Sequence, residues 1–202
     1  MKIICIGRNY SNHAKEMNSP IPKEPLFFMK PDTALFRESN FYYPEFTKDL
    51  HHEVELVVKI AKVGKHISVA NAHKYYNEIG LGIDFTARDL QRECKEKGLP
   101  WEKAKAFDNS AVISQKFIPK DQLELNNITF SLTKNEETVQ EGNSRDMLFS
   151  IDVLISHISK YITLKTGDLI YTGTPEGVSP IQIGDNLSGY LNGNKLFSIH
   201  IK

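Results

Sequence analysis

The sequence has little cysteine, no long apolar run and no excess of charge of either sign. Cys5 and Cys94, the two cysteines in 202 residues, stand far apart and fit no metal-binding or redox spacing, so we expect free thiols in a reducing compartment. The longest apolar runs are a handful of residues, too short to cross a bilayer. Because 25 basic residues balance 25 acidic ones without long runs of one sign, we expect neither a nucleic-acid partner nor a membrane partner.

The N-terminus also lacks the pattern of a signal peptide. Residues 1–6 lead straight into Gly7-Arg8-Asn9, which leaves no room for an apolar targeting core. We therefore expect a cytoplasmic protein. A length of 202 residues suits one domain, spanning 1–202. A chain of this size buries about 70 % of its unfolded surface in a core.

What is present centres on residues 51–60, whose side chains alternate as in a β-strand. The apolar side chains at the even positions form one unbroken face, which predicts the core side: Val54, Leu56, Val58 and Ile60. Glu53 and Glu55 share the opposite face. Their Cα atoms are expected to lie roughly 6.5–7 Å apart, so both carboxylates reach one point.

Two ionised carboxylates that converge in this way repel each other. One of them takes up a proton unless a cation lies between them, and a divalent metal is the simplest such cation. The alternative is a sheet with one solvated face, on which two glutamates need no further explanation. The stretch alone does not decide between these interpretations.

A second pair of chemical interest lies near the N-terminus, where residues 8–17 have helical character. His13 and Glu16 are three residues apart and therefore share a helix face. A carboxylate beside an imidazole raises its basicity and fixes its tautomer, as a general base requires. A surface pair without function is the alternative. The helix is short and prolines follow it, so we expect residues 9–20 to form a lid.

Asp84 interrupts the apolar end of a predicted strand, 79–85. A carboxylate there is costly unless it is paired, caps a helix or binds a metal, and the sequence leaves helix capping open. Thr86 to Asp89 has the spacing of a capping box, which predicts a helix through Lys97 that Gly98 ends. Residues 101–108 show no periodicity and are predicted as a loop, in which Lys105 is solvated or holds an anionic substrate.

The remaining elements are mostly strands in hairpins. Helices are predicted for residues 68–78 and from a cap at Ser144, and residues 33–50 are predicted to be irregular. Residues 167–172 form a strand whose following turn, 173–177, offers backbone amides and a threonine hydroxyl to an anion, without the pattern of a phosphate-binding loop. The predicted fold class is α+β, with a mixed, mostly antiparallel sheet system.

Several of these motifs, taken in order, resemble the fumarylacetoacetate hydrolase family. The similarity is greatest to its small single-domain acylpyruvase and oxaloacetate decarboxylase members, and it covers almost the whole chain. The segments that carry it are Gly7-Arg8-Asn9-Tyr10 with His13 to Met17, Leu50 to Leu56, Asp84 with Thr86 to Gln91, Lys97 to Trp101 with Lys105, and Gly167-Asp168 with Thr172 to Pro175 and Gly177-Val178.

The resemblance implies a β-roll-like catalytic domain that is usually a homodimer. It implies Mg²⁺ or Mn²⁺ held by Glu53, Glu55 and Asp84, and a His13–Glu16 pair on a mobile lid. It also places Lys105 in the active site. Three carboxylates suit a hard cation better than zinc, for which His or Cys is the usual ligand.

The family's chemistry implies a small 2-oxo acid as the substrate. We expect a metal-dependent hydrolase that cleaves the C–C bond of acylpyruvates to pyruvate and a carboxylic acid through a metal-bound enolate. Oxaloacetate decarboxylation through the same enolate is the alternative, followed by a 2-hydroxymuconate-type isomerase and a non-catalytic ligand-binding protein. His13 would activate water, and the residues expected to hold the substrate are Lys105, Arg8, Gln91 and Thr174.

Overall fold

Three β-sheets and five α-helices make up the part of the chain that the computed structural model describes, residues 1–16 and 20–202. The largest sheet has eight strands, seven of them in the order β2-β1-β13-β6-β7-β9-β3, with β10 paired to β7. In that order its strands are Leu26–Lys30, Ile3–Gly7, Leu169–Tyr171, Val54–Ile60, Tyr76–Asp84, Ala111–Ile113 and Leu35–Phe36, and β10 is Ile118–Pro119.

Two smaller sheets complete the β-structure. A five-stranded sheet has the order β12-β11-β15-β16-β4, and a three-stranded sheet has the order β14-β5-β8. The strands of the first are Glu137–Asn143, Thr129–Lys134, Asn186–Leu191, Asn194–Ile201 and Asn40–Phe41; those of the second are Ser179–Pro180, Leu50–His52 and Thr86–Ala87.

Strand pairing is mostly antiparallel, with parallel pairs at β1–β13, β4–β16 and β3–β9. In the first of these pairs, Ile3 lies opposite Leu169, so the first strand of the chain is held by one of the last. The mixed, mostly antiparallel α+β fold predicted from the sequence is confirmed.

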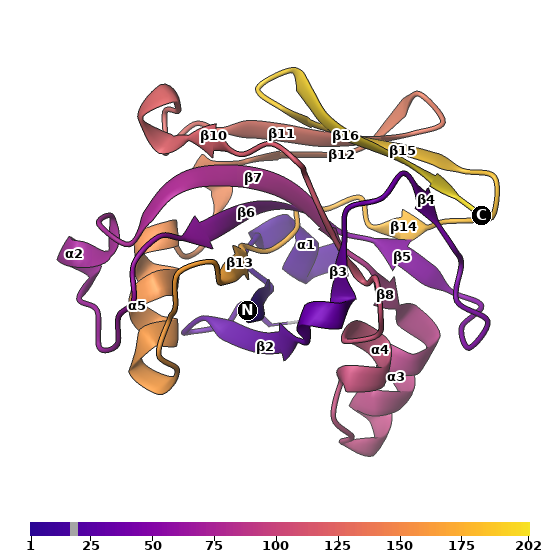
Figure 1. Cartoon of the computed structure of the whole chain (residues 1–202). Helices are drawn as coiled ribbons and strands as arrows, with labels where there is room; N and C mark the ends of the chain where they lie inside the picture. The colour runs from indigo at the N-terminus through magenta and orange to yellow at the C-terminus, as the bar shows by residue number, and fades with distance from the viewer. Residues whose placement is uncertain (17–19) are drawn as a thin grey trace.

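The main core lies between β6–β7 and the five-stranded sheet, which covers this curved pair in Figure 1. The predicted apolar face of β6 supplies four of its buried residues, Val54, Leu56, Val58 and Ile60. The opposite face of β6 is also buried, because Val57 packs in a second, smaller cluster with Ile3, Tyr171 and others. Glu55 is therefore buried. The alternative interpretation, a sheet with one solvated face that carries both glutamates, does not hold for it.

The helices lie around this sheet system, and one of them, the first in the chain, lies near its middle in Figure 1. The five α-helices are α1 (Ser11–Glu16), α2 (Val69–Ala72), α3 (Arg88–Lys97), α4 (Glu102–Lys105) and α5 (Ile151–Tyr161), and the 3-10 turns are Asp32–Ala34, Lys120–Gln122 and Ser144–Asp146. Figure 1 shows α3 and α4 together at the end of the molecule away from α2 and α5. α3 ends at Gly98, which adopts the left-handed conformation (φ +63°), as its sequence position predicted.

Two predicted helices differ from the structure. The helix expected over 68–78 stops at Ala72, and Tyr76 already belongs to β7, because the aromatic ring of Tyr76 is buried in the core. The helix expected from Ser144 begins only at Ile151. The Ser144 hydroxyl donates to the carbonyl of Leu125 (2.8 Å) and so joins two loops instead of capping the helix.

Three smaller predictions also need correction. The irregular segment 33–50 contains β3, β4 and the first residue of β5, and the loop predicted for 101–108 contains α4. Thr86 does not cap α3, because it lies in β8 and its hydroxyl accepts a hydrogen bond from Lys105 Nζ (2.5 Å). Asp89 accepts instead from the hydroxyl of Thr47 (2.6 Å).

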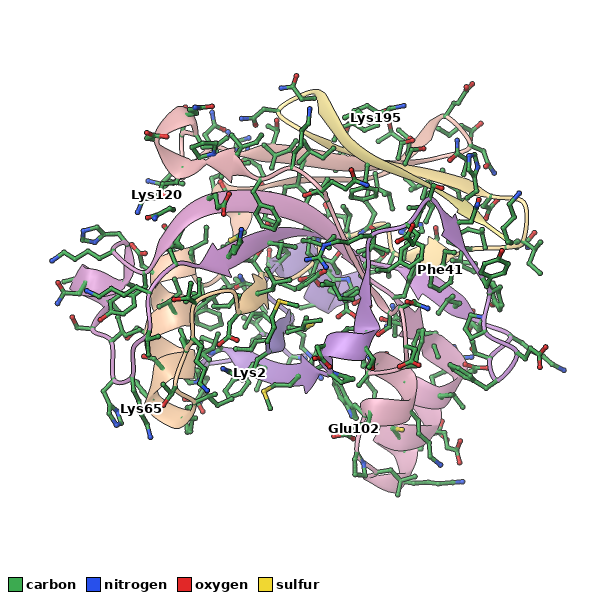
Figure 2. All side chains as sticks on the ribbon, viewed as in Figure 1. Lys2, Phe41, Lys65, Glu102, Lys120 and Lys195 are labelled. Carbon is green, nitrogen blue, oxygen red and sulfur yellow. The ribbon has the colours of Figure 1, made fainter. Side chains whose placement is uncertain are left out.

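Charged side chains are spread over the surface. In Figure 2, Lys65, Glu102 and Lys195 project outward from different elements, whereas Phe41 lies within the fold. Among the described residues, no helix has both the length and the apolar character needed to cross a membrane.

Candidate active site

A cavity of about 330 Å³ brings together eight of the nine site residues predicted from the sequence. The eight that line it are Arg8, His13, Glu53, Glu55, Asp84, Gln91, Lys105 and Thr174. The ninth, Glu16, lies beside His13. Ile6, Leu26, Phe27, Phe28 and Trp101 add apolar walls, so a small polar ligand would sit against a partly dry surface.

Three buried carboxylates form one corner of this cavity. Glu53, Glu55 and Asp84 are 5 %, 1 % and 1 % exposed, and one oxygen of each lies within 4.8 Å of the others. The register of β6 with β7 explains the arrangement: Val54 lies opposite Ile83, and the backbone N–H of Asp84 donates to the carbonyl of Glu53 (2.8 Å). Asp84 is the last residue of β7 and therefore reaches the face that holds both glutamates.

Cations surround Glu53. Lys105 Nζ donates to Glu53 Oε2 (2.7 Å) and to Asp84 Oδ2 (3.0 Å), and Arg88 Nη2 donates to Glu53 Oε1 (2.7 Å). Burial by itself would raise the pKa of Glu53, but the charges of Lys105, Arg88 and His13 outweigh it and hold that pKa well below its usual range. Glu53 is therefore ionised at neutral pH.

Glu55 has the opposite environment. Burial, then the charges of Asp84 and Glu53, raise its pKa well above the usual value, although the backbone N–H of Gly173 donates to Glu55 Oε2 (2.6 Å). The protein alone thus does not neutralise all three carboxylates. Asp84, by contrast, is paired at both oxygens, with Lys30 Nζ 2.8 Å from Oδ1 and Lys105 Nζ 3.0 Å from Oδ2. Three converging carboxylates, of which Glu55 has no ion pair among the described residues, fit a hard divalent cation.

The His13–Glu16 pair closes another side of the cavity. His13 Nδ1 lies 3.2 Å from Glu16 Oε2, and the other oxygen of Glu16 accepts from the backbone N–H of Gly177 (3.1 Å). Because a carboxylate only accepts hydrogen bonds, the neutral ring carries its proton on Nδ1, which leaves Nε2 as a base. The end of α1 thereby contacts the turn after β13.

The predicted lid, residues 9–20, is partly outside what can be described. Its residues 17–19 lie outside the described part of the chain, and the helical portion is α1. α1 contacts the turn that follows β13 through one further side chain, because Asn12 Nδ2 donates to Glu176 Oε1 (3.1 Å). That α1 moves when a ligand binds stays a prediction.

Polar groups for a ligand line the rest of the cavity. Arg88 Nη1 donates to Gln91 Oε1 (2.7 Å), which leaves the amide N–H groups of Gln91 for other partners. Arg8 and Lys95 form no ion pair with any residue in the ranges 1–16 and 20–202. Arg8 also has a backbone φ of +60°, a conformation that costs free energy in a non-glycine residue. Of the described non-glycine residues with positive φ, Arg8 alone lines this cavity.

Sequence reasoning missed several of these residues. Lys30 is one of them: it is buried beside Asp84 and donates to Ser110 Oγ (2.9 Å) and to the carbonyls of Ser110 (3.1 Å) and Lys105. Arg88 was read only as part of a capping box, and Lys95 was not singled out. The sequence offered one signal for Lys30: it directly ends an apolar strand, a position at which a lysine can be buried.

Comparison with known proteins agrees with this geometry. The family model described as fumarylacetoacetate (FAA) hydrolase C-terminal matches residues 2–202. The chain is 46 % identical over 193 residues to the Mus musculus protein named oxaloacetate tautomerase FAHD1, mitochondrial, covering 95 % of this chain and 87 % of that one. It is 42 % identical over 186 residues to the mitochondrial oxaloacetate decarboxylase of Dictyostelium discoideum, covering 91 % and 85 %.

A solved structure extends the comparison to the fold. The fumarylpyruvate hydrolase of Pseudomonas aeruginosa, crystallised with Mn²⁺ and pyruvate, superimposes with a TM-score of 0.93 at 35 % identity, covering all of this chain and 89 % of the other. The match extends over nearly the entire length in each comparison, and it includes the segments that carry the cavity. The chain belongs to the fumarylacetoacetate hydrolase family.

Proposed function

We propose that this protein is a metal-dependent enzyme that acts on oxaloacetate and catalyses its keto–enol tautomerisation. The observation that carries the proposal is the arrangement of charge in the cavity. A base formed by His13 and Glu16 and a cluster of three carboxylates share it with Arg8 and Lys95, which have no ion pair among the described residues. Two such cations suit a substrate with two carboxylates.

The positive charge around Lys95 supports a dianionic substrate. Partial burial and the charges of Arg88 and Arg8 lower the pKa of Lys95, so Lys95 and these two arginines are three cations near one region of the cavity. A monocarboxylate such as acetylpyruvate leaves part of this charge unused, whereas oxaloacetate offers a carboxylate to each end of the cavity. Relatives at 46 % and 42 % identity carry oxaloacetate in their names.

Glu53, Glu55 and Asp84 would hold Mg²⁺ or Mn²⁺, which supplies a Lewis acid for the oxygen that gains charge. His13 Nε2 then removes a proton from C3 of oxaloacetate, and Glu16 stabilises the imidazolium that forms. The electron pair of the C–H bond forms the C2=C3 double bond, and the π pair of the carbonyl moves to the C2 oxygen, where the Lys105 ammonium and the Thr174 hydroxyl would stabilise the negative charge. One proton leaves carbon and one is added to oxygen, so the reaction is balanced without water.

Hydrolysis of an acylpyruvate is the second candidate. It is supported by the same His13–Glu16 pair, which has the geometry to activate a water molecule, and by the similarity to the Pseudomonas aeruginosa fumarylpyruvate hydrolase. Fumarylpyruvate also carries two carboxylates, so the charge argument admits it. Oxaloacetate decarboxylation, a further alternative, needs no activated water and would depend less on His13.

One experiment separates these reactions. The purified protein with Mg²⁺ is given enol oxaloacetate, and the decay of enol absorbance is followed together with pyruvate formation; acetylpyruvate and fumarylpyruvate are assayed in parallel. We expect enol decay to be much faster than pyruvate release. We also expect His13→Ala to reduce tautomerisation by about 10²–10⁴-fold, and the surface variant His73→Ala to leave it unchanged. Cleavage of acylpyruvates without accelerated enol decay would favour the second candidate.

The assembly and location of the protein are proposed on the resemblance and composition alone. We propose a homodimer, which sedimentation velocity tests directly. The cytoplasmic location stays a prediction, and fractionation of cells that express a tagged chain would test it.

A further inference from the structure

One side chain from the five-stranded sheet reaches the active site across the core. Gln140 of β12 is 2 % exposed and uses all of its amide hydrogen-bonding groups. Its Oε1 accepts from the backbone N–H of Val54 (3.0 Å) and faces His52 Nδ1 (2.8 Å). Its Nε2 donates to Thr174 Oγ1 (2.9 Å) and to the carbonyl of Pro175 (3.1 Å).

The orientation of this amide follows from its partners. The Val54 N–H is only a donor and the Pro175 carbonyl is only an acceptor, so exchanging the amide oxygen and nitrogen would place like groups against each other at both ends. Gln140 therefore presents N–H to Thr174 and oxygen to His52. The direction of the hydrogen bond to Thr174 is fixed by groups that cannot reverse.

The same logic fixes His52. Because Gln140 Oε1 only accepts, His52 Nδ1 carries the ring proton, and Nε2 accepts from the hydroxyl of Ser179 (2.8 Å). Ser179, His52 and Gln140 thus form a chain of hydrogen bonds that all donate toward Thr174, an arrangement in which neighbouring bonds polarise each other.

This chain determines what the Thr174 hydroxyl can do. Its oxygen accepts from Gln140, and its own hydrogen has no acceptor within residues 1–16 and 20–202. Thr174 lines the cavity beside the carboxylate cluster. A threonine hydroxyl without a fixed partner would rotate between donor and acceptor roles, whereas this one is held as an acceptor on the core side.

We propose that Gln140 is a positioning residue that directs the hydroxyl proton of Thr174 into the cavity, toward the substrate oxygen that gains negative charge. This inference rests on the proposed function, which supplies that oxygen. A donor that is already oriented stabilises developing charge without reorganisation during the reaction. The role concerns the transition state more than the bound substrate, because the charge on that oxygen is greatest in the transition state.

A double-mutant cycle tests whether Gln140 acts through Thr174. The variants are Gln140→Met, Thr174→Val and the double substitution, with Thr174→Ser as the conservative variant that restores a hydroxyl. We expect Thr174→Val to lower kcat by about 100-fold. Gln140→Met should lower kcat at least about tenfold with little change in KM, since the hydroxyl remains but loses its direction. In the Thr174→Val background, Gln140→Met should cost no further kcat.

Controls distinguish this role from structural support. Gln115→Met makes the same change at an exposed glutamine and should leave kcat unchanged. Should Gln140→Met fail to fold, Gln140→Glu keeps acceptors for Val54 and His52; its carboxylate would draw the Thr174 proton away from the cavity and give the same kcat loss. Additive losses in the double variant, or an unchanged kcat in a folded Gln140 variant, would overturn the proposal.

The same double-mutant cycle can be measured without turnover. Calorimetry gives the affinity of each variant for oxalate in the presence of Mg²⁺. Oxalate resembles a planar enolate, so its affinity should fall in Gln140→Met and Thr174→Val without additivity. If the wild type binds oxalate but turns over neither oxaloacetate nor acylpyruvates, the proposed reaction is wrong while the positioning role is still measured. If the wild type does not bind oxalate, both are overturned.

Discussion

Glu53, which directly precedes β6, and Glu55, the second residue of β6, line the same cavity, yet their pKa values shift in opposite directions. Lys105 and Arg88 lie against Glu53 and lower its pKa against the effect of burial. Burial and the neighbouring carboxylates raise that of Glu55. Two identical side chains thus differ in how readily they ionise before any ligand binds, and the difference predicts how each responds to substitution.

Removing the charge of Glu55 should have opposite effects on folding and on metal binding. With a chelator present, Glu55→Gln should raise the Tm, because the uncharged amide avoids the repulsion and still accepts from Gly173. With Mg²⁺ at about 100 times its Kd, the wild type should gain about 2.7 kcal/mol of stability, which the variant loses. Differential scanning fluorimetry with and without Mg²⁺ measures both, and Glu141→Gln, at an exposed position, is the control.

The pH dependence of this effect has a definite sign. The folded pKa of Glu55 is higher than its unfolded value, so the folded state binds the proton more tightly. The contribution of Glu55 to the stability of the chelated wild type should therefore fall as the pH rises from about 4. The stability of Glu55→Gln relative to the wild type should accordingly increase over the same range. Equal slopes for the two proteins would contradict the assigned environment of Glu55.

His52 should govern the response to mild acid. Its folded pKa of about 4 is below the unfolded value of about 6.5, so the unfolded state binds the proton more tightly between these pH values. Stability should fall as the pH drops from 6.5 to 4, by on the order of 3 kcal/mol from this residue. Urea unfolding of the wild type and His52→Gln over this range measures the effect, and the exposed His73→Gln should behave as wild type.

Lys30 should matter more for folding than any surface lysine. It is buried, pairs with Asp84 Oδ1 at 2.8 Å and donates to Ser110 Oγ. Lys30→Met leaves a buried carboxylate without this partner, which typically costs about 3–5 kcal/mol. A divalent cation at Asp84 should restore part of the loss. Chemical denaturation with and without Mg²⁺ measures this; Lys97→Met, at an exposed ion pair, should show no comparable loss.

Lys95 should distinguish substrates by their number of carboxylates. Lys95→Met should raise KM for oxaloacetate about tenfold, equivalent to about 1.4 kcal/mol, and should change KM for acetylpyruvate little. Lys103→Met, at an exposed position on α4, should change neither. Equal changes for the two substrates would mean that Lys95 acts on the carboxylate that both share, or through the general field of the cavity.

The parts of the site that the sequence predicted are those with a local pattern. Alternation along β6 put Glu53 and Glu55 on one face because the period of a strand is a property of a few consecutive residues. The spacing of His13 and Glu16 predicted their contact for the same reason, and the structure shows it at 3.2 Å. By contrast, only the family resemblance predicted that Asp84 lies beside the glutamates. The pairing of β6 with β7 brings them together, and neither strand's own sequence predicts that pairing.

The errors arose where distant partners compete with a local motif. The Thr86–Asp89 capping box failed because Lys105 takes the Thr86 hydroxyl and Thr47 takes the Asp89 carboxylate. Gln140 was unnoticed because its partners lie in other sheets and turns, 86 residues from it at Val54 and 34 at Thr174. In each case the favourable contact depends on tertiary structure, which short-range propensities do not contain.

The parallel pairing of β1 with β13 also constrains how the protein is made. Ile3 is translated long before its partner Leu169, which follows it by 166 positions. The backbone N–H of Lys2 reaches Asp168 Oδ1 (2.8 Å) across the same 166 positions. Contacts so far apart in sequence form slowly, because a long loop must close before they contribute. The nascent chain must therefore carry β1 with one edge unpaired until β13 has been made, and the cavity is complete only once Thr174 has been translated.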